Sequence, residues 1–313
     1  MDDAKRNGWK AAIALAPAAI MLIIFTFFPI INTFVMSFMN NFKFVDGAGP
    51  FAVAHNGTFG IDGYIYVLTD PTFRDAVLNT LILVVISVPL TIIISLFLAV
   101  ALNSIKKLQG LYQTIFFLPY VTNTIALGMV FSAMFGPTES GLINTIIIKF
   151  GGQAMEWTTA MASKWNSFWV ILIYTIWNGL AFKILVFMSG LQSIDKQYYD
   201  AARIDGTSKR RILWKITIPL LSPQILYISI TSFIGAFKSY TGVISIFGRG
   251  AYDFGGATRK DWITVVGYIY KQMENSASKG ALTKASAGAV ILLIIILIFT
   301  GIQNIVAKKR VHY

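Results

Sequence analysis

The sequence contains no cysteine and only two histidines. The absence of cysteine excludes disulfides, thiolate metal sites and a lipid-modified N-terminal cysteine. With two histidines and no His-Glu-x-x-His pattern, a zinc-dependent hydrolase site has no support. The chain also lacks a Gly-x4-Gly-Lys-Ser/Thr sequence, so it cannot bind ATP as P-loop proteins do. We therefore expect no enzyme activity, and no metal or cofactor bound by this chain itself.

Charged residues are scarce as well. Of 313 residues 13% are charged and 56% are hydrophobic, whereas soluble domains carry roughly 25% charged residues. The charges are clustered and leave long uncharged stretches, for which lipid is the expected solvent. The formal net charge of +12 fits Lys and Arg retained on the cytoplasmic side of a membrane. Because no soluble basic domain is left over, we expect no nucleic-acid partner.

Long apolar segments recur along the chain. A bilayer core about 30 Å thick needs roughly 20 apolar residues in a helix. Over residues 1–313 we expect one transmembrane domain, with spans at about 11–38, 76–102, 111–135, 165–190, 212–237 and 285–307. The first apolar run is too long for a signal-peptide core, so we expect an uncleaved span there. The stretch Leu142 to Ile148 is too short to span and suits an interfacial or re-entrant helix.

The charges between these segments favour both termini in the cytoplasm. The short inside segments then carry Lys106, Lys107 and the basic cluster at 196–215, whose side chains can attract anionic lipid headgroups. The outer loops, at about 39–75, 136–164 and 238–284, are longer and hold most of the acidic residues. We therefore expect a multi-pass protein of a bacterial plasma membrane.

The inside loop between the fourth and fifth predicted spans, residues 194–211, has the pattern of a short helix. Four of its residues recur at helical spacing and give one face of small and aromatic groups: Tyr198, Ala201, Ala202 and Asp205. Gly206 can end this helix in a left-handed conformation. Small side chains would let a partner approach the backbone closely, but the residues alone fit an interfacial helix without a partner equally well.

The same loop resembles the EAA motif of binding-protein-dependent ABC importer permeases. The resemblance lies in Asp200-Ala-Ala202, in Gly206 four residues later, and in Ile216-x-Ile218-Pro219. Asp200 stands where the family has Glu, and Ile218 where it has Leu. The sequences Trp177-Asn-Gly179 and Ser189-Gly-Leu-Gln-Ser-Ile194 are similar to the carbohydrate-uptake branch of these permeases, the maltose-transporter type.

The outer loop before the last span departs from that branch. It lacks the family's Leu-Thr-Gly-Gly-Pro run and has Phe247-Gly-Arg-Gly250 and Phe254-Gly-Gly-Ala257 instead. This departure bears on the docking role of the loop and on the class of solute. It does not affect the resemblance of the cytoplasmic motif, which lies elsewhere in the chain.

The resemblance implies an all-α transmembrane fold, the six-helix bundle of a type I ABC importer permease with a cytoplasmic coupling helix. It implies a sugar transport complex in the cell membrane, made with a second homologous permease, two ATP-binding subunits that hold ATP and Mg, and an extracytoplasmic solute-binding protein that delivers an oligosaccharide. The implied positions of contact with the ATPase are Tyr199, Asp200, Ala201, Ala202, Asp205 and Gly206.

A sugar pathway needs amides, hydroxyls and aromatic rings at mid-membrane, because sugars are bound by hydrogen bonds and by ring stacking. The candidates in or beside the predicted spans are Asn123, Thr124, Tyr174, Trp177, Asn178, Lys183, Ser239 and Tyr240. The Asn and Thr also suit helix association, and the Trp and Tyr also suit interface anchoring.

Lys183 is the only ionisable residue well inside a predicted span, where a charge is costly unless it pairs or reaches water. Two interpretations stay open. Its amine lies on the translocation path, or its stem runs toward the cytoplasmic interface near Gly190. The alternative function for the whole chain is a secondary transporter or channel for a small polar solute without an ATPase, but repeated halves and intramembrane carboxylates, which that class commonly has, are missing.

Overall fold

The computed structural model describes residues 2–42, 58–105, 109–137, 139, 141–159, 161–248, 262–275, 278 and 280–310. The chain forms two compact units, which are described separately: Met1–Phe73 with Ile269–Leu293, and Arg74–Tyr268 with Ile294–Tyr313. The basic pair Lys106 and Lys107 and the loop sequence from Arg249 to Ala257, used above as sequence signals, lie outside the described residues.

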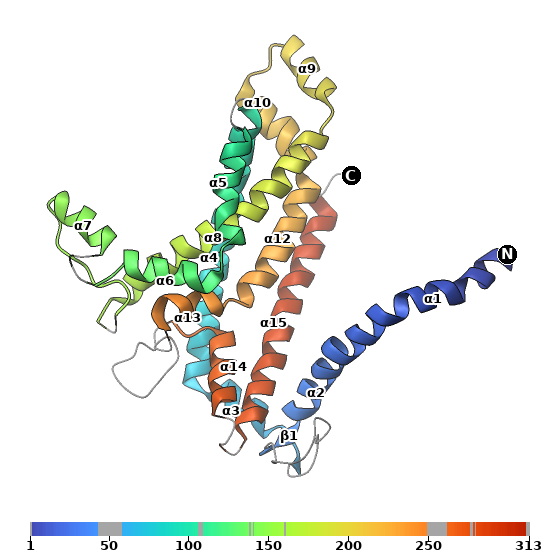
Figure 1. Ribbon diagram of the computed structural model, residues 1–313, viewed down its shortest axis with the longest axis vertical. Coiled ribbons are helices and arrows are strands. Elements are labelled where there is room, and N and C mark those ends of the chain that lie inside the picture. The colour runs from blue at the N-terminus through green and yellow to red at the C-terminus, as the bar shows by residue number, and fades with distance from the viewer. Residues whose placement is uncertain are drawn as a thin grey trace. The chain divides into compact units, whose positions relative to one another are not determined.

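The first unit begins with a long apolar helix and ends with the first half of the last helix. Its elements, coloured from blue at the N-terminus in Figure 1, are α1 (Asp2–Leu22), the π-helical turn η1 (Ile23–Phe27), α2 (Phe28–Ser37), β1 (Met39–Asn40), β2 (Thr58–Phe59), α3 (Asp62–Thr69) and the start of α15 (Ala281–Arg310). The strands pair antiparallel, with Met39 opposite Phe59.

Thr283 of α15 ties the short sheet to the last helix. Its hydroxyl donates to the Met39 carbonyl oxygen and accepts the backbone N–H of Phe42 at 3.2 Å. At the other side of the sheet, the Asn40 amide donates to the Asp62 carboxylate at 2.6 Å. Buried polar groups need such partners, so the Thr283 contacts hold the segment from Met39 to Phe42 against the start of α15.

The second unit is a bundle of helices joined by short segments. Its elements are α4 (Pro71–Ser104) from Arg74 on, α5 (Gln109–Val121), α6 (Thr124–Met134), α7 (Leu142–Lys149), α8 (Lys164–Ser193), α9 (Lys196–Ile204), α10 (Lys209–Ile212), η2 (Leu213–Thr217), α11 (Ile218–Leu220), α12 (Ser222–Phe237), α13 (Thr241–Phe247), α14 (Val265–Glu274) up to Tyr268, and α15 from Ile294 on. Fully buried apolar groups of α4, α8, α12 and the residue before α12 form its core, among them Ala99, Ile184, Phe187, Leu221 and Ile228.

In the part of the chain that the structure describes, four helices are long and apolar enough to cross a membrane: Gly8–Ser37, Pro71–Ser104, Lys164–Ser193 and Ala281–Ala307. They coincide with the predicted first, second, fourth and sixth spans. The predicted third and fifth spans are each a bent pair of helices, Gly110–Val121 with Thr124–Met134 at 97° and Lys209–Leu220 with Ser222–Phe237 at 66°. The count reaches the predicted six when each bent pair is one span.

The bend in the third span has a local cause. Asn123 has extended ψ (125°), and its side-chain oxygen accepts the backbone N–H groups of Ile125 and Ala126 at 2.8 and 3.4 Å. Asn is a favoured N-cap because this bond satisfies backbone donors that a new helix leaves free. α6 therefore starts as a separate helix at the point where a continuous apolar pattern predicted none.

The bend in the fifth span lies between two prolines. Leu221 leaves helical geometry (φ −85°, ψ 1°), and Pro219 and Pro223 occupy the first turns of α11 and α12. Proline suits the first turn of a helix because its missing N–H would have no helical acceptor there. The two prolines therefore favour the start of α11 and the start of α12, and the bend lies at Leu221 between them.

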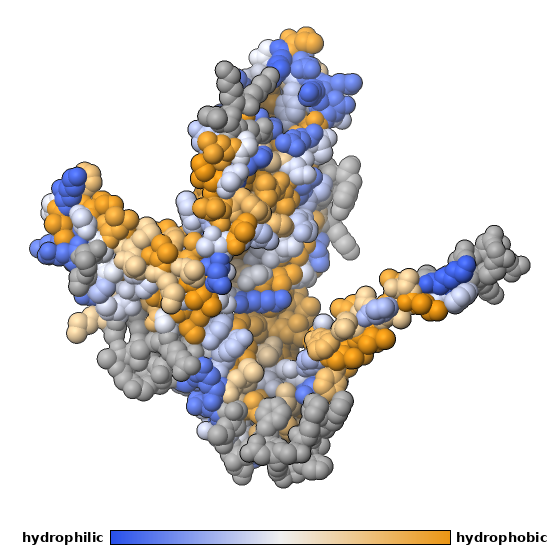
Figure 2. All heavy atoms as spheres, in the orientation of Figure 1, coloured by the Kyte–Doolittle hydropathy of each residue, from blue (hydrophilic) through white to orange (hydrophobic). Residues whose placement is uncertain are grey.

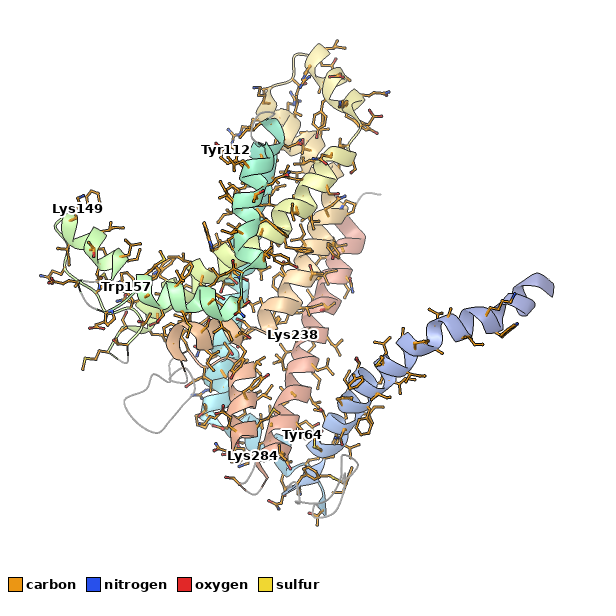
Figure 3. The ribbon with its side chains drawn as sticks, viewed as in Figure 1. Tyr64, Tyr112, Lys149, Trp157, Lys238 and Lys284 are labelled. Atoms are coloured by element: carbon orange, nitrogen blue, oxygen red, sulfur yellow. The ribbon has the colours of Figure 1, made fainter. Side chains whose placement is uncertain are left out.

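The predicted short helix beyond the third span is confirmed as α7. Its buried Asn144 holds the segment that follows, because the side-chain amide donates to the Gly136 and Met155 carbonyl oxygens at 3.1 and 3.0 Å, and its oxygen accepts the indole N–H of Trp157 at 2.9 Å. Trp157 and Lys149, which ends α7, are labelled in Figure 3.

A buried hydroxyl joins α4 to the start of α14. The Thr80 oxygen accepts the backbone N–H of Val265 at 3.0 Å and is shielded from solvent. We expect Thr80→Val, which keeps the shape and removes the acceptor, to lower the stability of the purified chain by about 1–3 kcal/mol, because a buried N–H is left unpaired. Thermal unfolding in detergent measures the change. Thr80→Ser keeps the acceptor, so an equal loss in this variant would contradict the explanation.

Candidate functional site

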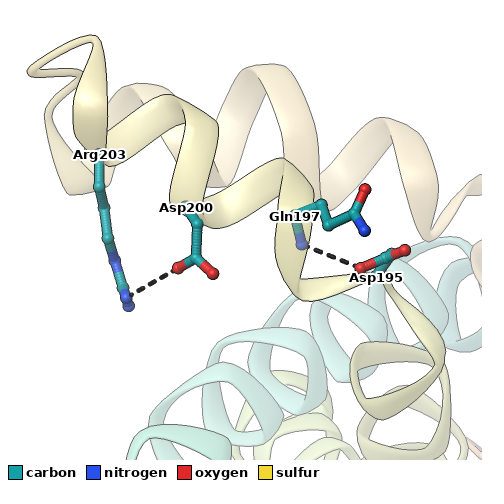
Figure 4. A network of polar contacts seen from close by, with 4 residues as sticks. All are labelled: Asp195, Gln197, Asp200 and Arg203. Carbon is teal, nitrogen blue, oxygen red and sulfur yellow. Dashed lines mark hydrogen bonds and ion pairs between the residues drawn. The ribbon is translucent and has the colours of Figure 1, made fainter.

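α9 is the short helix predicted between the fourth and fifth spans. Asp195 caps it, since its carboxylate accepts the backbone N–H of Gln197 at 2.9 Å. Arg203 approaches Asp200 at 3.4 Å one turn apart, and both side chains are largely exposed (Figure 4). Such an exposed pair adds little stability, so the charge of Asp200 remains available to another group.

The end of α9 has the geometry that the sequence predicted for Gly206. Its φ is +67°, the left-handed region that glycine adopts without steric cost. The Gly206 N–H donates to the Arg203 carbonyl oxygen at 3.1 Å, and the Thr207 N–H donates to that of Ala202 at 2.9 Å. This pair of bonds is the Schellman motif, which stops the helix and turns the chain back.

The four residues predicted to share one face of α9 do share it. Tyr198, Ala201, Ala202 and Asp205 line a hollow of about 650 Å³ between α9 and the helix that returns, together with Arg211, Lys215 and Ile216. Ala202 is buried against its own chain, whereas Ala201 is exposed. Ala201 is therefore the alanine that lies open to a partner, and the assignment of Ala202 to the coupling site stays a prediction.

Two large side chains of α9 are exposed, Tyr198 on the face that lines the hollow and Ile204 outside that face. Ile204 is 87% exposed and Tyr198 is 55% exposed. Figure 2 shows mostly hydrophilic atoms over α9 and α10, so these apolar groups stand within a polar surface. Tyr199 points inward instead, and its hydroxyl lies 3.3 Å from that of Thr217 in η2.

A cavity of about 420 Å³ lies among α4, α8, α12 and the segment that follows α12. Six of the eight predicted pathway residues line it: Thr124, Tyr174, Asn178, Lys183, Ser239 and Tyr240. Asn123 and Trp177 are not among its lining residues. The first caps α6, and the second is exposed on another side of α8.

Two contacts shape the cavity wall. The Tyr174 hydroxyl donates to the Thr124 carbonyl oxygen at 3.0 Å, which positions the first turn of α6 beside α8. Gly242 lets α13 approach, because a Cβ there would lie 2.6 Å from the Tyr174 ring. The close approach explains why the start of α13 needs glycine.

Lys183 points into this cavity. Its amine donates to the Gly179 carbonyl oxygen at 3.0 Å, one turn toward the N-terminal end of α8. The interpretation in which its stem runs the other way, toward α9 and the predicted cytoplasmic interface, is therefore wrong.

Several lining residues escaped the sequence reasoning. Ser87 and Thr91 lie one turn apart on α4, and Lys238 lies at the end of α12 (Figure 3). The rings of Tyr120 and Phe182 stack at 6.0 Å and both line the cavity. The two hydroxyls one turn apart in an apolar helix could have indicated a polar face of α4. The ring pair joins two helices, so the sequence alone could not predict it.

The chain matches known proteins over nearly its whole length. The family described as "Binding-protein-dependent transport system inner membrane component" matches residues 91–312. The arabinooligosaccharide transport permease AraP of Bacillus subtilis is 31% identical, with 96% of this chain and 92% of the relative covered. The lactose transport permease LacF of Rhizobium radiobacter is 29% identical, with 97% and 95% covered.

Solved structures carry the same fold. A bacterial ABC transporter involved in the import of the acidic polysaccharide alginate superposes with a TM-score of 0.80, at 20% identity and with 98% of each chain covered. A second structure, of the alginate transporter with its oligosaccharide-bound periplasmic protein, also gives 0.80, at 19% identity. The chain belongs to the binding-protein-dependent transport system inner membrane components, and it is a multi-pass permease subunit of an ABC importer and not its ATPase.

Proposed function

We propose that this permease forms half of the translocation pathway for an oligosaccharide, delivered by an extracytoplasmic solute-binding protein. The observation that carries the proposal is the cavity, in which amide, hydroxyl and aromatic groups converge within a membrane bundle. Such groups match the hydrogen bonds and ring faces of a sugar. The names of two relatives, which are permeases for arabinooligosaccharides and lactose, point to the same class of solute.

α9 is the proposed coupling helix of this permease. Tyr199, Asp200, Ala201, Ala202, Asp205 and Gly206 are the proposed coupling residues. In this proposal both termini are cytoplasmic, a second permease completes the pathway, and two separate subunits bind ATP and Mg. The capped ends of α9 and its exposed apolar groups support a docking role, because a defined helix with Ile204 exposed offers a partner a rigid apolar contact.

The geometry also supports a route from docking to transport. The Tyr199 hydroxyl contacts Thr217 of η2, and η2 leads through the bend at Leu221 into α12. α12 contributes Thr231 and Ser232 to the cavity wall. Closure of the ATPase pair on ATP would displace α9 and, through these contacts, switch the bundle between inward-open and outward-open states.

Reconstitution of the complete complex in proteoliposomes tests the proposal. We expect ATP hydrolysis to rise when the solute-binding protein is added with an oligosaccharide, and the same oligosaccharide to enter the vesicles. The solute-binding protein without sugar is the control. Hydrolysis that no carbohydrate stimulates, with no carbohydrate taken up, would refute the carbohydrate assignment.

A further inference from the structure

The cavity wall is positively charged. Among the described residues that line it are two lysines, Lys183 and Lys238, and no aspartate or glutamate. A lysine well inside a membrane helix is costly unless its charge is balanced or reaches water. The balance is not supplied by the part of the chain that the structure describes, because no ion pair involves Lys183 there.

The amine of Lys183 has spare hydrogen-bonding capacity. A lysine ammonium has three N–H donors. Within the described residues one of them is used, in the 3.0 Å bond to the Gly179 carbonyl oxygen. That bond holds the amine against α8 at Gly179, the residue after Asn178, which also lines the cavity. The remaining donors can serve an anionic group that enters the cavity, and the bond to Gly179 fixes where this group must lie.

An aromatic platform adjoins the charged group. Phe182 precedes Lys183 in α8, and its ring stacks on that of Tyr120 from α5 with an interplanar angle of 21°. Both rings line the same cavity. A flat pair of rings suits the apolar face of a sugar ring, whereas the amine suits a negative substituent on that sugar. One small volume thus offers both kinds of contact.

We propose that this cavity selects saccharides that carry an anionic group, with the ammonium of Lys183 pairing with that group. The inference rests on the proposed carbohydrate transport and names the class of carbohydrate. A uronate carboxylate and a sugar phosphate share the required chemistry, since both are oxyanions that accept charge-assisted hydrogen bonds from an ammonium. Lys238, at the end of α12, adds a second positive charge to the same cavity.

The test compares solutes that differ in charge and hardly in shape. The complete complex with its own solute-binding protein is reconstituted in proteoliposomes, and ATP-dependent uptake is measured for trigalacturonate, its neutral methyl ester and a phosphorylated trisaccharide. We expect wild-type uptake to favour one of the anionic solutes over the ester by roughly tenfold or more. Which anion is favoured distinguishes a carboxylate from a phosphate.

Variants of Lys183 distinguish selection by the permease from selection by the solute-binding protein, because the same solute-binding protein is used throughout. Lys183→Met keeps the stem and removes the charge, so it should lower uptake of the favoured anion by roughly tenfold while uptake of the methyl ester is unchanged or higher. Lys183→Arg should restore the preference. Wild-type uptake of the neutral ester alone would overturn the inference. An equal loss of uptake for charged and neutral solutes in Lys183→Met would also overturn it. That result is expected if Lys183 instead pairs with a carboxylate of the second permease.

Failure of the proposed function looks different in the same assay. In that case no saccharide, charged or neutral, is taken up by the wild-type complex. If Lys183→Met assembles with its partners and retains the wild-type preference for the anion, the role of Lys183 is refuted and with it the inference, while the proposed carbohydrate transport stands.

Discussion

Gly206→Pro is expected to abolish the stimulation of ATP hydrolysis by the loaded solute-binding protein. Gly206 has φ +67°, a conformation that proline cannot adopt because its ring fixes φ near −65°. Proline also removes the N–H that donates to the Arg203 carbonyl oxygen at 3.1 Å. The C-terminal end of α9 would then change direction. We expect a loss of at least about tenfold in stimulated hydrolysis, since a misplaced coupling element costs far more than its local strain of roughly 1–3 kcal/mol.

Gly151→Pro is a matched control for this experiment. Gly151 also has positive φ (+84°), and its N–H donates to the Ile148 carbonyl oxygen at 2.9 Å just beyond α7. A Cβ meets nothing within 4 Å at either glycine. The local strain is therefore similar, but it lies far from α9 in the sequence. Gly206→Asn, which tolerates the left-handed conformation, should keep most of the stimulation. Unchanged stimulation and complex assembly in Gly206→Pro would show that the coupling assignment is wrong.

Ile204→Asp should separate the permease from its ATPase subunits. Ile204 is 87% exposed at the end of α9, and full burial of such a side chain contributes about 1.5–3 kcal/mol. Truncation in Ile204→Ala should weaken association by roughly tenfold, because each 1.4 kcal/mol corresponds to a factor of ten. Asp would leave an unpaired charge in the contact, so we expect a further loss and no stable complex.

Co-purification of the ATPase subunits with tagged permease measures this effect. Phe150→Asp is the control, because Phe150 is also 87% exposed but follows α7. The Phe150→Asp permease should co-purify with the ATPase subunits in wild-type amounts. Full recovery with Ile204→Asp would mean that the exposed isoleucine does not face the ATPase.

The periodic and compositional features of the sequence predicted the helices well. Long apolar runs, one of them interrupted by Lys183, identified the four long helices among the described residues, because length and hydropathy indicate whether a helix can cross the bilayer. The left-handed turn at Gly206 also followed from sequence, since glycine is the residue that adopts it without cost. The alternative of a transporter without an ATPase is wrong, because the chain belongs to the ABC importer permeases.

The bends and the buried face of α9 could not be predicted in the same way. The break at Asn123 depends on a side-chain cap that competes with a continuous apolar pattern. Pro119 predicted a kink in this span, but the apolar pattern did not indicate a new helix at Thr124. The burial of Ala202 depends on where the returning helix packs, which is a tertiary contact. The cavity likewise joins Lys183 to Tyr120 and Lys238 from three helices, and only the fold places them together.

The bend at Leu221 has a mechanical consequence. From Lys209 to Gly242 the chain runs without interruption from the hollow beside α9 to the wall of the cavity, through η2, α11 and α12. Leu221 is fully buried in the core at the corner of this path, against α8. If α9 docks on the ATP-binding subunits as proposed, a displacement of the first arm would pivot about the buried Leu221, and a small movement near those subunits would swing the arm that lines the cavity.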